Sequence, residues 1–220
     1  MSMANIVVHS QGKFGSGYRV TLPRVIHSEW IKFRSVRSTV VTIGVAFLTV
    51  LLIASLASLF GAAQDPVENS LFGVLFGQVF LGVLGAVLVT TEYATGLIRS
   101  TFTAVPKRLP VLWAKVIAMT GVTFVTMLAA SFLAFLVGQA LYRGGGESAS
   151  LSDPGVLRAI VGAAIAPTAI AVMGIALGVL LRHTAIAVGI LFGLLFVVPI
   201  IFEVLGLGGT WVDIAAYLPS

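Results

Sequence analysis

The side chains that most often carry enzymatic chemistry are few in this chain, and their spacing matches no catalytic motif. Cysteine is absent, which excludes disulfides, thiolate metal sites and cysteine nucleophiles. A serine lies between two glycines at residues 15–17, but in a polar N-terminal segment rather than at a strand-to-helix turn, so we expect no nucleophile there. The three histidines are scattered: His9, His27 and His183.

Nucleotide and metal chemistry lack their usual motifs as well. The sequence contains no Gly-x-x-x-x-Gly-Lys-Ser/Thr phosphate loop and no His-Glu-x-x-His helix. We therefore expect no catalytic, cofactor-binding or metal-binding residue, and no enzymatic activity of the chain itself.

The composition indicates which structure the remaining residues must build. Of 220 residues, 58% are hydrophobic and 10% are charged, and the mean hydropathy is +1.08. Soluble domains carry roughly a quarter charged residues, so a soluble fold is excluded, and disorder with it. The apolar runs are continuous rather than alternating, which excludes a transmembrane barrel. The sequence predicts an all-α integral membrane protein, a polytopic helical bundle.

Five segments are long and apolar enough to cross a bilayer, which requires about 20 residues. They define one membrane domain, residues 21–220, after a flexible tail, residues 1–20. We expect kinks at Pro167 and Pro199, which fall inside the last two spans. The predicted spans are residues 39–60, 71–91, 116–138, 159–181 and 185–202.

The basic residues predict how these spans are oriented. If the chain crosses the membrane at each span, only Arg143 and Arg158 fall on one side. The positive-inside rule assigns the other, basic side to the cytoplasm, with the N-terminus there and residues 206–220 outside. The net charge of +5 then reflects the orientation of the chain in the membrane, and no nucleic-acid partner is expected. The cytoplasmic set is Lys13, Arg19, Arg24, Lys32, Arg34, Arg37, Arg99, Lys107, Arg108, Lys115 and Arg182.

The interiors of the spans contain almost no charge, which argues against a proton relay. Gln78 and Gln139 are polar but neutral, and Gln78 is a candidate contact for a transported substrate. Small residues four apart allow helices to approach closely, either within one bundle, which we favour, or at a dimer seam. These pairs are Gly73 and Gly77, Ala134 and Gly138, Gly174 and Gly178, and Gly189 and Gly193.

Two amphipathic elements flank the spans on the cytoplasmic side. In residues 21–37, Ile26, Trp30 and Phe33 recur on one helical face among basic residues, which predicts an elbow helix lying on membrane lipid. The alternative is a simple basic flank of the first span.

The second element is the loop at residues 91–115. Gly96 permits a sharp bend, and Pro106 ends a short helix. Its apolar stripe must be covered by membrane or by a partner. Glu92, the only acid of the loop, could simply pair with a nearby base. The stripe consists of Ile98, Phe102 and Val105.

These two elements resemble a known family. Residues 28–39, Ser-Glu-Trp-Ile-Lys-Phe-Arg-Ser-Val-Arg-Ser-Thr, resemble the N-terminal elbow of actinobacterial permeases of the ABC type-2 exporter family. Residues 91–100, Thr-Glu-Tyr-Ala-Thr-Gly-Leu-Ile-Arg-Ser, are similar to that family's loop after the second span, as are Val-Pro-Lys-Arg at 105–108 and Ala-Lys at 114–115. The likeness covers the whole chain in span order.

The resemblance implies a permease subunit of an ATP-driven exporter in the bacterial plasma membrane. Such permeases pair as dimers, and each binds a separate ATPase subunit, which holds ATP and Mg²⁺, through a coupling helix. By this likeness the coupling helix lies in the loop at residues 91–115. Ile98 and Phe102 would enter the ATPase, while Glu92 and Arg99 hold the bend; Tyr93, Gly96 and Val105 belong to the same motif.

The family pattern also has six spans and an outer re-entrant segment. We expect residues 206–220 to begin that segment and a further apolar stretch of about 20 residues to follow Ser220. The alternative function is a non-transporting membrane protein, such as an immunity, sensor or scaffold subunit.

Overall fold

The computed structural model of the protein describes residues 27–28, 30–31, 35–61, 65–96, 108–142 and 149–205. All regular elements within these ranges are helices, as predicted. Five helical segments are long and apolar enough to cross a membrane, and each covers one of the five predicted spans with one to a few further residues. They are Arg37–Phe60, Pro66–Ala94, Leu112–Leu141, Val156–Leu181 and Thr184–Phe202.

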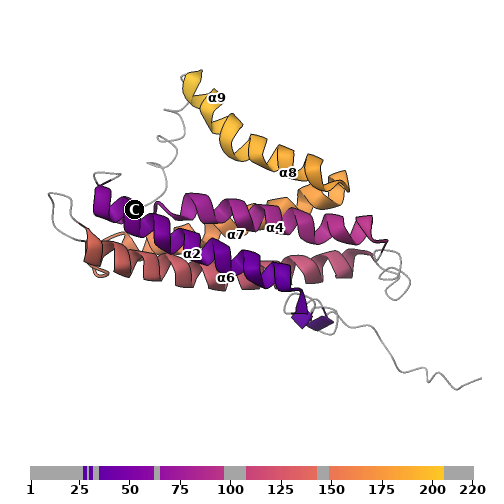
Figure 1. The fold of residues 1–220 in the computed structure, drawn as a ribbon, viewed down its shortest axis with the longest axis horizontal. Helices are drawn as coiled ribbons and strands as arrows, with labels where there is room; N and C mark the ends of the chain where they lie inside the picture. The colour runs from indigo at the N-terminus through magenta and orange to yellow at the C-terminus, as the bar shows by residue number, and fades with distance from the viewer. Residues whose placement is uncertain are drawn as a thin grey trace, which may run out of the picture.

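Four long helices lie side by side and alternate in direction, and the fifth span leaves them at an angle (Figure 1). We call the end of the bundle where α4 and α7 finish the Glu92 end, and the end where α2 and α6 finish the Gln139 end. The elements are α2 (Arg37–Phe60), α3 (Pro66–Leu71), α4 (Val74–Ala94), α6 (Arg108–Leu141), α7 (Val156–Leu181), α8 (Thr184–Phe192), the π-helix η1 (Gly193–Val197) and α9 (Val198–Val204).

Helix boundaries follow local chemistry. The carboxylate of Asp65 accepts the N–H of Val67 at 2.7 Å and so caps α3, which starts at Pro66. Helix α2 ends at Gly61, whose φ of 65° is the left-handed conformation that a glycine adopts without strain. Within the spans, several hydroxyl groups donate to carbonyls one turn back, as Thr123 does to Met119, so these groups are satisfied without water. The buried hydroxyls of Ser58 and Ser131 have no such partner among the described residues.

Close packing in the bundle depends on glycine. A Cβ at Gly174 would overlap the carbonyl of Gly82, and one at Gly85 would overlap the carbonyl of Ala171, so α4 and α7 touch backbone to backbone. Side chains of any size would hold these helices apart.

Three of the four small-residue pairs serve the bundle, which is the role that the sequence favoured. Gly73 and Gly77 face Val50 of α2, Gly174 and Gly178 face α4, and Gly138 faces Ser58 and Ser70. The fourth pair is different, because a Cβ at Gly189 or at Gly193 would meet no atom within 4 Å.

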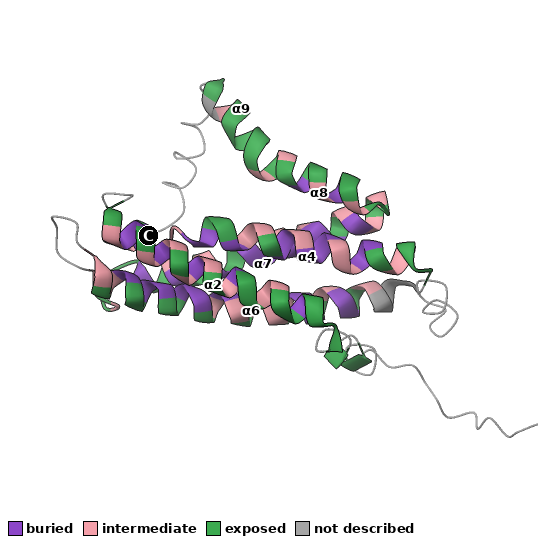
Figure 2. Cartoon of the chain, in the orientation of Figure 1, coloured by how far each residue is buried: buried purple, intermediate pink, exposed green. Residues whose placement is uncertain are grey.

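The fifth span is the least buried (Figure 2). In its most apolar stretch 11% of the residues are buried, against 50% in the second span. The two prolines of the last spans also behave differently: α7 remains α-helical through the buried Pro167, whereas Pro199 is the second residue of α9, just after the π-helix η1. Of the two expected kink sites, only Pro199 therefore lies beside a departure from the regular α-helix.

Candidate functional site

The expected functional residues divide between described and undescribed parts of the chain. Glu92, Tyr93 and Gly96 are described, at the end of α4. Trp30 and Gln78 are described as well, whereas Ile26 and Phe33 of the elbow, and Ile98, Arg99, Phe102 and Val105 of the loop, lie outside the described residues. Residues 206–220, where we expect the re-entrant segment, also lie outside them.

Glu92 forms a buried ion pair with Lys115. The Lys115 Nζ donates to the Glu92 Oε1 at 2.9 Å, and the two side chains are 5% and 12% exposed. Lys115 belongs to α6 and lies 23 residues further along the chain, so the pair joins the last turn of α4 to the second turn of α6. Both residues make further interactions as well. Because the pair is buried, its loss is far more costly than that of a surface pair.

Tyr93 joins the same turn of α4 to a second neighbour. The guanidinium carbon of Arg182 lies 5.4 Å from the centre of the Tyr93 ring, a cation–π contact. Arg182 caps α7 with a φ of 52°, an unusual conformation for a residue with a side chain. The tyrosine ring itself packs on the main apolar core.

Thr90 supplies the third connection. The hydroxyl of Thr184, in the first turn of α8, donates to the buried hydroxyl of Thr90 at 2.8 Å. Thr90 in turn donates to the carbonyl of Ala86 at 3.0 Å. Three residues within one stretch of four in α4 thus contact α6, the end of α7 and the start of α8.

The chain turns immediately after this cluster. Gly96 has a φ of 72°, in the left-handed region, and is the last described residue before the loop. A residue with a Cβ would be strained at this φ, which explains why glycine stands at the bend. The base of the loop is therefore fixed in direction by Gly96 and in position by the three contacts of α4.

The Gln139 end is held by neutral groups. The Gln139 Nε2 donates to the carbonyl of Pro66 at 2.8 Å and to the Ser70 Oγ at 2.9 Å. Its Oε1 accepts the N–H of Ala149 at 2.7 Å. One amide therefore ties α6 to α3 and to the segment that precedes α7.

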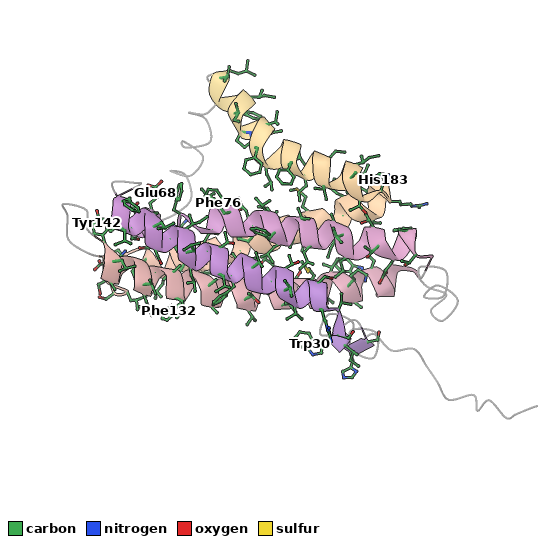
Figure 3. All side chains as sticks on the ribbon, viewed as in Figure 1. Trp30, Glu68, Phe76, Phe132, Tyr142 and His183 are labelled. Carbon is green, nitrogen blue, oxygen red and sulfur yellow. The ribbon has the colours of Figure 1, made fainter. Side chains whose placement is uncertain are left out.

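Trp30 and Gln78 stand apart from both clusters. Trp30 is exposed, and residues 27, 28, 30, 31 and 35 have helical conformation, separated from α2 by the extended Val36. Gln78 is half-buried within α4. Glu68 and Tyr142 lie at the opposite end of the bundle from His183 (Figure 3).

The sequence offered a pair between Glu92 and a nearby base as an alternative, and Lys115 is that base, whereas the partner of Tyr93 was not anticipated. Lys115 was assigned to a loop, because the third span was expected to start at residue 116, whereas α6 begins at Arg108. A lysine directly beside an apolar run of spanning length was the available signal, since a cation at that depth needs a partner. Thr90, Thr184 and Arg182 carried no comparable signal.

The described residues contain no group of three or more histidines, aspartates or glutamates that could hold a metal ion. No protein-family model, no curated protein and no solved structure matches this chain. Functional inference therefore rests on the residues themselves and on the geometry of the Glu92 end.

Proposed function

We propose that this chain is the membrane-spanning permease subunit of an ATP-driven exporter, in the plasma membrane of a bacterium. Its partner is a separate ATPase subunit, which binds ATP and Mg²⁺ and docks on the loop after α4. The chain itself holds no cofactor. Transport follows when hydrolysis in the partner displaces this loop and the spans shift between inward and outward access.

The observation that carries this proposal is the threefold attachment of the last turn of α4. A displacement of the loop acts first on Gly96 and on the turn that contains Glu92 and Tyr93. From there the Lys115 ion pair transmits it to α6, and the Arg182 and Thr184 contacts transmit it to α7 and α8. The ion pair at the base of the loop supports this role, because it links the turn next to the loop directly to α6.

The distribution of charge supports a cytoplasmic position for the Glu92 end. Arg37, Lys115 and Arg182 lie at this end, whereas Arg158 lies near the start of α7, at the other. Basic residues collect on the cytoplasmic side of bacterial membrane proteins. The loop then faces the compartment that contains ATP.

A second copy of the chain completes the substrate pathway. Gly189 and Gly193 lie on one face of the fifth span with open space beside them, whereas the other small-residue pairs are used within the bundle. Helices in lipid associate through such faces. The fifth span thus supplies the seam between copies, and α4, with the half-buried Gln78, lies next to it through its contacts with α8.

The test is co-purification of the chain with an ATPase encoded beside it, comparing Phe102→Asp with Phe102→Leu as a matched control. A carboxylate in the apolar stripe would have to be desolvated on docking, at a cost of about 2–7 kcal/mol for a polar group without a partner. We expect Phe102→Asp to insert normally but to lose the ATPase, and Phe102→Leu to retain it. Equal recovery of the ATPase with both variants would contradict docking through this stripe.

A further inference from the structure

The fifth span consists of two halves that differ in how they are held. The first half is α8, the second is α9, and the π-helix η1 separates them. In Figure 1 the span starts against the bundle and diverges from it towards α9. The contrast between the halves is visible in their burial, their hydrogen bonds and their backbone.

The α8 half is clamped to the bundle. Ala187 and Leu191 are fully buried, and Leu191 lies directly over Gly82, where any Cβ would collide with its side chain. The Thr184 hydroxyl bonds to Thr90, and α8 packs on both α4 and α7. These contacts make α8 part of the same body as α4 and α7.

The α9 half is not buried against the bundle. From residue 192 onwards no residue whose side chain is described is buried, although Phe202 makes a further interaction. The extensive contacts of η1 are with α8 and α9, its own neighbours in sequence. Burial against the described bundle therefore does not set the direction of α9.

The backbone at the junction is that of a hinge. The N–H of Val198 bonds to the carbonyl of Gly193, five residues back, so the helix is widened by one residue there. Pro199 has no N–H, so the carbonyl of Leu195 receives no α-helical bond from it. Sharp bends in helices occur at such π-turns, prolines and glycines, and residues 193–199 combine all three.

We propose that η1 is a pivot in the fifth span, about which α9 swings while α8 stays with the bundle. This hinge is a property of the chain whether or not it transports. It would allow the α9 end of the span to open and close against α2 without disturbing the polar cluster at the Glu92 end.

Distances between pairs of nitroxide labels test the pivot, because the chain has no native cysteine to interfere. All label sites are exposed in the structure. The full chain is reconstituted in lipid nanodiscs and diluted with unlabelled protein, so that only distances within one copy are measured. The pair Phe60 and Val204 spans α2 and α9, the pair Val41 and Ile186 spans α2 and α8, and the pair Phe60 and Leu157 spans α2 and the start of α7.

We expect a broad or two-peaked distance distribution for Phe60 and Val204, and narrow single peaks for the other two pairs. The double variant Gly193→Ala/Pro199→Ala restores a backbone N–H at position 199 and removes the extra backbone freedom of glycine at position 193. It should therefore narrow the distance distribution of Phe60 and Val204 to the width measured for the other two pairs. Gly189→Ala, in the same span but outside η1, should leave it broad. A narrow distribution for Phe60 and Val204, equal breadth in all three pairs, or no narrowing in the double variant would each overturn the pivot.

Discussion

The two ends of the helical bundle are held by different chemistry. At the Glu92 end a charged pair and a cation–π contact join α4 to α6 and α7. At the Gln139 end a single neutral amide joins α6 to α3 and to the segment before α7, and two of its three bonds involve backbone groups. Both ends are cross-linked by side chains from distant parts of the sequence.

The difference indicates which end of the bundle can respond to a charged partner. The bonds of the Gln139 amide are between neutral groups, and two of them reach backbone groups of α3 and of the segment before α7. A charged pair interacts over a longer range and responds to any further charge that approaches it. We infer that the Glu92 end, and not the Gln139 end, responds to a charged partner.

The largest expected effect is at the ion pair. Lys115→Met removes the cation that lies 2.9 Å from the Glu92 carboxylate, which should lower the free energy of unfolding by up to about 3–5 kcal/mol. The double variant Glu92→Gln/Lys115→Met should recover part of the loss, because it removes both charges of the pair. Unfolding by SDS in mixed micelles, followed by tryptophan fluorescence, measures both. A single variant as stable as the unchanged protein would show that the pair is not buried.

The glycine contacts should give the next largest effect and separate bundle packing from pairing of copies. Gly174→Ala places a methyl group against the carbonyl of Gly82, and such overpacking costs about 1–3 kcal/mol of unfolding free energy. Gly189→Leu meets open space, so it should leave the unfolding curve unchanged but reduce cross-linking between copies in native membranes. If Gly189→Leu cross-links between copies as fully as the unchanged protein does, the fifth span does not form the seam between copies.

The smallest effect is expected at the Gln139 end. Gln139→Leu removes three hydrogen bonds, and bonds of this kind in membrane proteins average about 0.6 kcal/mol each, so a loss of about 1–2 kcal/mol follows. Partner binding at the opposite end should be unaffected, in contrast to the ion-pair variants. A Gln139→Leu protein that releases the ATPase would mean that the two ends are not independent.

Much of the fold could be predicted from the sequence, because long apolar runs in a chain with few charges leave only spanning helices. The three small-residue pairs that pack within the bundle followed from the same physics. The sequence could not predict that Lys115 is the base that pairs with Glu92. This pairing depends on the rotation of α4 relative to α6, which apolar faces alone do not determine. The π-helix was equally hidden, since Pro167 and Pro199 look alike in sequence and only the second adjoins one.

We expect the two ends of the bundle to face different compartments, with the Glu92 end in the cytoplasm where a partner ATPase could reach it. Because the chain has no cysteine, single cysteines introduced at the exposed positions Ser152 and His183 report on the Gln139 end and the Glu92 end respectively. A membrane-impermeant maleimide applied to intact cells should label Ser152→Cys at once, and His183→Cys only after the cells are permeabilised. Labelling of His183→Cys in intact cells, with Ser152→Cys protected, would contradict the orientation and the coupling mechanism that depends on it.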